Sequence, residues 1–530
     1  MKSHSTLRIT LSLLFALSLV CPPARAQSGE IVLMQTLAER TGFLETSRYA
    51  DVEAMTDAVA AASPMIHKTY FAYTNEGRAL PLLVFGDVAD ASATSVLASG
   101  RTRVFIQANI HAGEVCGKEA MLIMLRDLAN GGHASWADSL VVLVAPIYNA
   151  DGNERFHLTN RGLQNGPLGG MGQRPNAQGL DLNRDHMKLD SPEARSLVAL
   201  FNAYDPHVVV DLHTTNGTRH AYHLTYSPPL HPNTPPAINS MLRDSWLPAV
   251  TDSIRKRTGW EFYYYGNVPR RGEAGWYTFD HRPRFNNNYT GLRNRFAILS
   301  EAYAYASFEE RIRATLHFVE EILGYAHDNA EAIREITDAA DAEDIRGTSL
   351  AVRADFERSA EPVDILMGEV EEARNPYSGE RFLVRTEARS VERMYEYGTF
   401  APTESEVAPA AYYVPAGQHV VLDRLRDHGV VLEQLASDGT RSVERFRIDS
   451  LLVAPNEYQG HFEHDLRGAW ETETIVVPAG TYRVDVNQPL GRLIFSLLEP
   501  RSDDGFAVWG LVQPGESPRH YPIVRSTGNP

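Results

Sequence analysis

The sequence predicts an α/β domain, built on a mixed, mostly parallel sheet flanked by helices, with an α+β domain on its C-terminal side. Two features predict the first domain: short, continuous apolar runs, typical of strands covered on both faces of a sheet, and helical segments between these runs. The strands are expected at residues 80–85, 104–110, 140–147, 208–212 and 296–300. The helices are expected at residues 115–130, from residue 192 onward, at 235–258 and at 308–326.

Local signals set the limits of these helices. Gly131-Gly132 ends the first helix, and Gly259 gives the third a C-terminal stop. Ser191-Pro192-Glu193 begins the second helix with an N-cap residue, a first-turn proline and an acid. The helix ends therefore agree with the strand pattern.

The length of 530 residues is too great for one ordinary core, so two or more domains are expected. We place the α/β domain at residues 27–328, an acidic linker or helix at 329–344, and the α+β domain at 345–530. In the last region, helices are expected at residues 420–428 and 491–498, and strands at 430–434, 443–448, 474–477 and 482–486. We recognise no catalytic cluster there.

Residues 1–26 have the pattern of a secretory signal peptide. Lys2 and Arg8 precede an apolar run at residues 9–20, and Ala24-Arg25-Ala26 offers small residues for cleavage. The run is too short to span a bilayer, and no later run is long enough. The mature protein is therefore expected to be exported, either periplasmic or secreted, with Cys116 as its single cysteine. A thiolate metal ligand is one interpretation of Cys116, and a buried small apolar residue is the preferred one.

The charge balance argues against some partners. The chain has 67 acidic and 50 basic residues, a formal net charge of −17. Nucleic acids and anionic membranes require a basic face, so neither is expected as the main partner. The sequence gives no oligomeric state.

The chemistry-bearing residues follow predicted strands. His111 and Glu114 come directly after one strand, His213 ends a second, and Glu301 ends a third. Ligands of open α/β sheets bind at the carboxyl ends of the strands, so these distant residues can converge there. Two imidazoles and a carboxylate suit a catalytic Zn²⁺, one per chain, and a further carboxylate can serve as the base for a zinc-bound water. The pattern favours a metallohydrolase.

A polar segment, Asp181-Leu182-Asn183-Arg184, adds further candidates. Asp181 could accept a hydrogen bond from a ligand histidine and fix its tautomer. Asn183 and Arg184 offer an amide and a guanidinium fork, which suit a carboxylate. Taken alone, the segment is better explained as an N-cap with a surface ion pair.

Together these residues resemble the zinc carboxypeptidase family, the carboxypeptidase A-like metallopeptidases. His111 and Glu114 are similar to the family's first ligand pair, His213 to its third zinc ligand and Glu301 to its catalytic glutamate. Three other segments match in the family's order, namely Asn75-Glu76-Gly77-Arg78 with an N-E-G-R turn, Asn149-Ala150-Asp151-Gly152 with an N-P-D-G loop, and the Asp181–Arg184 segment with D-x-N-R. The resemblance covers residues 45–325.

The resemblance implies the roles of these residues. Zinc held by His111, Glu114 and His213 would polarise a water and the scissile carbonyl, and Glu301 would act as the base. Asn183 and Arg184 would hold the free C-terminal carboxylate of a peptide substrate. The alternative for Glu301 is a buried acid that forms an ion pair with Arg293 or Arg295.

The sequence departs from the family pattern at two places. Gln164 occupies the position of an arginine that stabilises the oxyanion, and Arg161 or Arg174 could substitute for it. The substrate-covering tyrosine has Tyr277 as its nearest candidate and Tyr289 as another.

Two alternative functions remain at this stage. One keeps the metal but changes the substrate, giving an amidase or deacylase that acts on peptidoglycan stem peptides or acylated amino acids. The other is a non-catalytic binding protein on a peptidase scaffold. The arginines of residues 270–295 could favour acidic peptides, or they could pair with the chain's own acids.

Overall fold

The computed structural model describes residues 34–526 except residues 216 and 516. The predicted signal peptide, residues 1–26, lies outside this part of the chain. Among the helices of the described part, none is long and apolar enough to cross a membrane.

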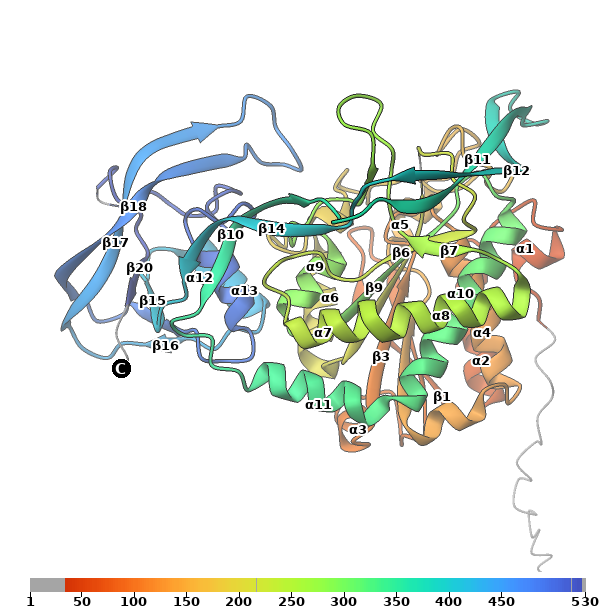
Figure 1. Cartoon of the computed structure of the whole chain (residues 1–530). Helices are drawn as coiled ribbons and strands as arrows, with labels where there is room; N and C mark the ends of the chain where they lie inside the picture. Colours follow the sequence, from red (N-terminus) through yellow and green to blue (C-terminus); the bar gives the residue numbers. More distant parts are fainter. Residues whose placement is uncertain (1–33, 216, 516, 527–530) are drawn as a thin grey trace, which may run out of the picture.

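An eight-stranded sheet with the strand order β1-β2-β4-β3-β5-β9-β6-β7 forms the centre of the molecule (Figure 1). Its four central strands, β4, β3, β5 and β9, run parallel, whereas β1, β2 and β6 introduce antiparallel pairs. The mixed, mostly parallel sheet predicted from the sequence is therefore confirmed. The strands are β1 (Ile66–Tyr73), β2 (Ala79–Phe85), β3 (Thr102–Ala108), β4 (Leu140–Ala145), β5 (Val208–Thr214), β6 (Leu224–Ser227), β7 (Phe262–Tyr264) and β9 (Phe296–Ala302).

The five predicted strands are the longer buried strands, whereas the three missed strands are either partly exposed or very short. Every residue of β3, β4 and β5 is buried, which produces the continuous apolar runs. Strand β1 is only partly buried and carries polar residues, and β6 and β7 are very short. Their sequences therefore lack the apolar run on which the prediction depended.

Helices cover both faces of the sheet. Figure 1 shows α2, α4 and α10 on one side of the strands, and α6 and α9 on the other. Helix α4 packs against α2 and α10, α6 packs against β1, and α9 packs against β5 and β9. The α-helices between residues 34 and 344 are α1 (Leu37–Arg40), α2 (Tyr49–Ala62), α3 (Ala93–Ala98), α4 (Cys116–Ala129), α5 (Ala150–Glu154), α6 (Pro192–Tyr204), α7 (Pro236–Ser240), α8 (Leu247–Thr258), α9 (Asn286–Leu292), α10 (Phe308–Asp328) and α11 (Ala330–Asp341).

The helix predicted at residues 235–258 is interrupted. A π-helical turn, Met241–Trp246, joins α7 to α8. Pro248 lies in the first turn of α8 and has no N–H for a regular helical hydrogen bond, so the wider turn before it fits its position. Gly259 ends α8 with a positive φ of 75°, as the sequence indicated.

The acidic stretch predicted as a linker or helix is mostly the helix α11, and an α+β region follows it. A six-stranded antiparallel sheet in the order β16-β19-β15-β20-β17-β18 is accompanied by two helices. These elements are β15 (Ala411–Val414), α12 (His419–Asp427), β16 (Glu433–Gln434), β17 (Gly439–Val453), β18 (His464–Val477), β19 (Tyr482–Asp485), α13 (Gly491–Leu498) and β20 (Val524–Ser526). The helices and strands predicted in this region are present, although β16, β17 and β18 differ in length from the prediction.

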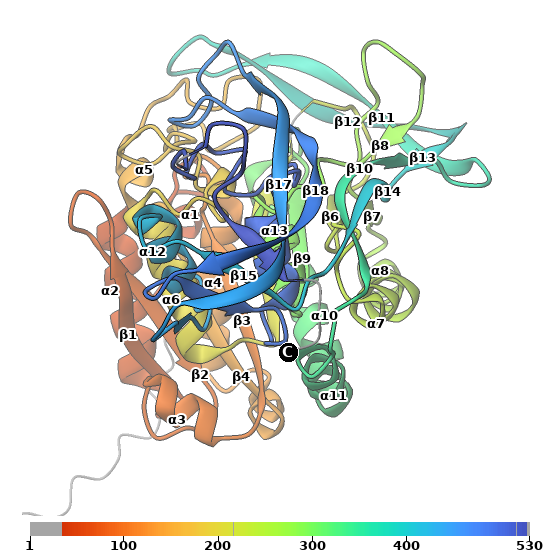
Figure 2. The same cartoon turned by 90° about the vertical axis from the view of Figure 1, so that its left-hand side faces the viewer.

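Two long strand pairs connect this region to the central part. Strand β10 (Ser349–Glu357) pairs with β14 (Thr399–Val407), and β11 (Val363–Arg374) pairs with β12 (Arg381–Met394). The short strand β13 (Glu396–Tyr397) runs parallel to β8 (Trp276–Tyr277), which precedes it by more than a hundred residues. In the view of Figure 2, β11 and β12 lie at the upper edge of the molecule, and β10 and β14 lie lower on its right-hand side.

Candidate metal centre and active site

The strand order brings the predicted ligands to one edge of the sheet. His111 and Glu114 lie in the turn between β3 and α4, and His213 lies in β5 next to β3. Glu301 lies in β9, directly opposite His213 in the parallel register. Between the first two ligands, a Cβ atom on Gly113 would lie 2.6 Å from Cγ of Arg161 and 2.7 Å from the Gly172 carbonyl oxygen, so glycine is needed there.

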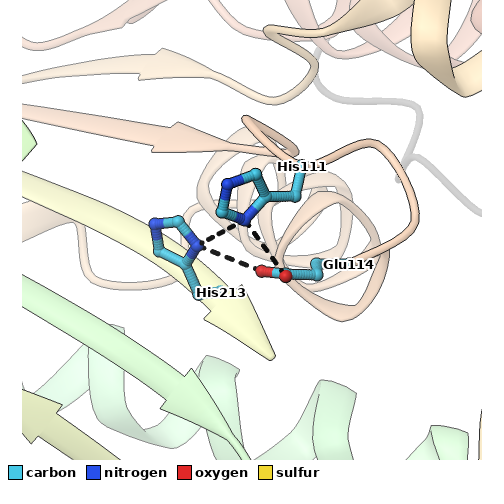
Figure 3. Close-up of side chains that lie close together, drawn as sticks. All are labelled: His111, Glu114 and His213. Carbon is cyan, nitrogen blue, oxygen red and sulfur yellow. Dashed lines mark hydrogen bonds and ion pairs between the residues drawn. The ribbon is translucent and has the colours of Figure 1, made fainter. Parts of the chain in front are cut away.

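His111, Glu114 and His213 form a compact group of possible metal ligands (Figure 3). Nδ1 of His111 lies 3.2 Å from Nδ1 of His213, and the Glu114 carboxylate oxygens lie 3.1 Å and 3.0 Å from these two nitrogens. Ligand atoms at about 2.0–2.1 Å from a tetrahedral zinc ion are roughly 3.3 Å apart. All three side chains are buried, and their spacing and chemistry fit a metal ion.

Two further carboxylates contact the far sides of the histidine rings. Oδ1 of Asp181 lies 3.0 Å from Nε2 of His111, and Oδ2 of Asp211 lies 2.9 Å from Nε2 of His213. A proton on each Nε2 leaves both Nδ1 atoms free to bind a metal, so these carboxylates favour the tautomer that a metal site needs.

The electrostatics of the group follow from its burial and its opposite charges. Burial by itself would lower the pKa of His213, but Asp211 and Glu114 outweigh this effect and raise it well above the usual value. Burial would likewise raise the pKa of Glu114, yet His111 and Arg161 hold it well below its usual range. The protein therefore stabilises a charged carboxylate at the centre of this group.

Glu301 differs from the other carboxylates of the site. Burial raises the pKa of its carboxyl to about 8, and the nearby charge of Glu114 adds to this effect. Its Oε2 is buried and has no hydrogen-bond partner among the described residues. Arg295 pairs instead with Asp205 and Asp341, so the predicted alternative of an ion pair with this arginine is absent.

A cavity of about 480 Å³ opens over the metal group and contains most of the predicted site residues. Arg184 lies in its wall with the guanidinium 3.9 Å above the ring of Phe285, and Asn183 accepts a hydrogen bond from the backbone N–H of Asn286. The lining residues also include His111, Glu114, Arg161, Arg174, Asp181, His213, Thr214, Thr215, Tyr265, Phe279, Leu299, Glu301, Tyr458 and Gln459.

Two arginines lie beside the group formed by His111, Glu114 and His213, whereas Gln164 lies away from this group. Nη2 of Arg161 lies 2.7 Å from Oε1 of Glu114, and Arg174 donates a hydrogen bond to Asp181 at 2.9 Å. Gln164 instead donates to the carbonyl oxygen of Thr215 and lies outside this cavity. Arg161 and Arg174 are therefore the guanidinium groups available where the sequence lacks the expected arginine.

The remaining matched segments support the loops around the site. Asp151 accepts hydrogen bonds from Thr74, Arg78 and the backbone N–H of Glu76. Asn149 donates to the carbonyl oxygens of Ile110 and Arg174. These contacts fix the segments that precede His111 and carry Arg174.

The structure corrects the prediction for the substrate-covering tyrosine. Tyr277 does not line the cavity, because β8 pairs with β13 and the Tyr277 ring stacks on Tyr397 with the ring centroids 4.0 Å apart. Tyr289 is also buried elsewhere, with its hydroxyl 2.8 Å from Nδ1 of His428. Tyr265, which the sequence did not single out, lines the cavity instead.

Three of the six arginines of residues 270–295, namely Arg282, Arg284 and Arg295, pair with acids of the same chain. Arg284 contacts Asp504 and Glu463, and Arg282 contacts Asp280. The pairing interpretation therefore holds for these arginines. Cys116 is buried, with Sγ 3.2 Å from the Thr214 hydroxyl oxygen, which confirms its preferred interpretation.

Several site residues were missed by the sequence reasoning. Asp211 could have been found, because residues two apart on a strand share a face and Asp211 precedes His213 by two. Tyr265, Tyr458 and Gln459 carried no local signal, since loops and the distant C-terminal region bring them to the cavity.

Comparison with known proteins agrees with this geometry. Residues 52–279 match the family model described as zinc carboxypeptidase. Carboxypeptidase 2 of Trichophyton tonsurans is 26% identical over 87% of this chain and 82% of its own length, and carboxypeptidase 2 of Trichophyton rubrum is 25% identical over 85% and 81%. Among solved structures, carboxypeptidase A of Helicoverpa armigera has a TM-score of 0.40 at 16% identity, covering 56% of this chain and 75% of its own. The metallo-carboxypeptidase of Burkholderia cenocepacia likewise has a TM-score of 0.40 at 16% identity, covering 53% and 69%. The family match over residues 52–279 and the buried His-Glu-His group show that this chain contains a region similar to a zinc carboxypeptidase domain.

Proposed function

We propose that the chain is an exported zinc carboxypeptidase that removes C-terminal residues from peptides. The observation that carries the proposal is the convergence of His111, Glu114 and His213 beside Glu301 in one cavity. Two imidazoles and one carboxylate form a donor set that suits Zn²⁺ and leaves a coordination position open. When bound, zinc would polarise a water and the scissile carbonyl.

Glu301 is the proposed general base. Its carboxyl lines the cavity, where a carboxylate can accept a proton from water and later deliver it to the leaving amine. Its buried Oε2 has no competing partner within residues 34–526 as described. Asp181 and Asp211 are proposed to hold the ligand histidines in their tautomers.

Substrate binding is assigned to the basic side of the cavity. Arg184 and Asn183 would hold the free C-terminal carboxylate, and Arg161 and Arg174 would stabilise charge that develops on the carbonyl oxygen. A buried guanidinium beside a reaction centre favours negative charge without reorganising during the reaction.

Export and the domain boundaries are also part of the proposal. The charged and apolar pattern of residues 1–26 supports export to the periplasm or the medium. We propose a catalytic domain at residues 27–328, an acidic segment at 329–344 and an accessory domain at 345–530, whose elements are described above.

The test is metal analysis combined with a mixed peptide library read by mass spectrometry. A carboxypeptidase should contain about one zinc per chain and release single C-terminal residues. A chelator should stop the release, and C-terminal amidation of the peptides should prevent it. Cleavage of amidated peptides, or hydrolysis only of acylated amino acids, would contradict the proposal.

A further inference from the structure

The tip of the β17–β18 hairpin, residues 454–463, reaches the metal centre from the C-terminal region. Strand β17 ends at Val453 and β18 begins at His464, so this segment is the connection between them. Its residues Tyr458 and Gln459 line the same cavity as His111 and Glu301. In Figure 1, the hairpin rises at the upper left and its tip turns toward the central part of the molecule.

Gln459 contacts the segment that supports a metal ligand. Its side-chain oxygen Oε1 accepts a hydrogen bond of 2.8 Å from the backbone N–H of Asp181. The Asp181 carboxylate lies 3.0 Å from Nε2 of His111, and its Oδ1 also accepts from the backbone N–H of Asn183. A continuous series of contacts therefore leads from Gln459 through Asp181 to His111.

Charged contacts on both sides of Gln459 anchor the tip. Nε2 of His461 lies 2.7 Å from Oδ2 of Asp190, and Glu463 lies 2.8 Å from Nη2 of Arg284. Arg284 also lies over the ring of Tyr458, with the centroid 5.5 Å away. The tip is thus held at the cavity independently of the Gln459 contact.

The backbone at Gln459 carries strain. Tyr458 and His461 exchange two backbone hydrogen bonds, and Gln459 and Gly460 between them have φ values of 51° and 83°. Such a two-residue hairpin turn requires positive φ at both central positions, where asparagine and glycine are favoured. Glutamine is unfavourable there, and strained residues of this kind cluster at functional sites.

We propose that Gln459 is a positioning residue of the metal centre and that the C-terminal region supplies part of the active-site wall. By accepting the Asp181 N–H, Gln459 fixes the carboxylate that orients His111. This inference rests on the proposed function, because it assumes that His111 binds a metal.

The test compares full-length variants at the tip. Gln459→Gly removes the side chain and relieves the positive φ, and Gln459→Asn suits the turn but is one methylene too short to reach Asp181. Glu457→Ala changes an exposed neighbour in the same loop and serves as the control. Zn²⁺ affinity is measured by competition with a chromophoric chelator, and Tm is measured on the metal-free proteins.

Both Gln459 variants should bind Zn²⁺ roughly tenfold more weakly than wild type, as for other residues that orient metal ligands, with the Tm of the metal-free protein unchanged or raised. The Glu457→Ala variant should match wild type in both measurements. Wild-type affinity in both Gln459 variants would overturn the inference, and so would a loss of affinity accompanied by a lower Tm, which would indicate a merely structural role.

Wild-type behaviour separates this inference from the proposed function. If wild type binds Zn²⁺ and hydrolyses peptides but the Gln459 variants are indistinguishable from it, only the positioning role fails. If wild type binds no Zn²⁺, both proposals fail together.

Discussion

Replacing Glu301 by glutamine should abolish hydrolysis without loss of the metal. Glutamine keeps the size of the side chain but cannot take a proton from water. General-base catalysis contributes typically 10²–10⁴-fold, about 3–5 kcal/mol of barrier, so the variant should keep at most about one hundredth of the wild-type kcat. His111, Glu114 and His213 are unchanged, and Zn²⁺ affinity should stay within a few-fold of wild type.

The same substitution should stabilise the metal-free protein. Glu301 has a pKa raised to about 8 in the folded protein, against a usual value of 4.5. Between pH 4.5 and 8 the folded state binds the proton more tightly than the unfolded state, so the stability of the metal-free wild type falls as the pH rises through this window. At pH 7 the cost is at most about 3.5 kcal/mol, at about 1.4 kcal/mol per pH unit above 4.5. Glutamine has no such cost.

The assay combines three measurements on wild type, Glu301→Gln and the exposed control Glu457→Gln. These are kcat with zinc bound, Zn²⁺ content, and urea unfolding of the chelated proteins at pH 5 and pH 7. A Glu301→Gln variant that retains more than a tenth of the wild-type kcat would refute the role of base. A variant less stable than wild type at pH 7 without metal would refute the account of the buried carboxyl.

Three further predictions concern residues that support the candidate site and the tip of the β17–β18 hairpin. Asp211→Asn removes the carboxylate beside Nε2 of His213 and should weaken Zn²⁺ binding roughly 10–100-fold, measured by competition with a chelator. Unchanged Zn²⁺ affinity would exclude a role of Asp211 in fixing the tautomer of His213. Arg184→Met should raise KM for peptides with a free C-terminus by roughly 10–100-fold, with a smaller effect on kcat, and Arg184→Lys should recover only part of this loss. If steady-state kinetics give the Arg184→Met variant the same KM as wild type, Arg184 does not bind the carboxylate. Asp190 has a folded pKa of about 2, because hydrogen bonding to His461 and the charge of Lys188 outweigh its burial. Asp190→Asn should therefore lower stability by about 2 kcal/mol at pH 7, and the difference should shrink as the pH falls from about 4 toward 2; a urea-unfolding difference that does not change with pH would contradict this.

The fold and the candidate site could be predicted best where a fully buried strand ends in a polar residue. Strands such as β3 and β5 are buried throughout, so their apolar runs predicted the sheet, and the polar residues that end them predicted the metal group. Strand β1 escaped prediction because it faces solvent in part. The convergence of His111, Glu114 and His213 could be predicted because the carboxyl ends of adjacent parallel strands must meet.

Residues brought in by distant segments could not be predicted. Tyr277 has a suitable spacing from Glu301, yet its pairing with β13 depends on a strand far along the chain and turns it away from the cavity. Gln459 follows Asp181 by 278 residues, and no periodicity or spacing connects the two positions. Only the packing of the C-terminal region determines both outcomes.

The pairing of β8 with β13 has a consequence for synthesis. Trp276, the first residue of β8, is fully buried in a cluster with Tyr222 and with Ile365 of β11. A nascent chain that has emerged only as far as α11 has an unpaired edge at β8 and an uncovered tryptophan, both of which invite association with other chains. The fold around β8 is therefore complete only once the chain as far as β13 has been synthesised.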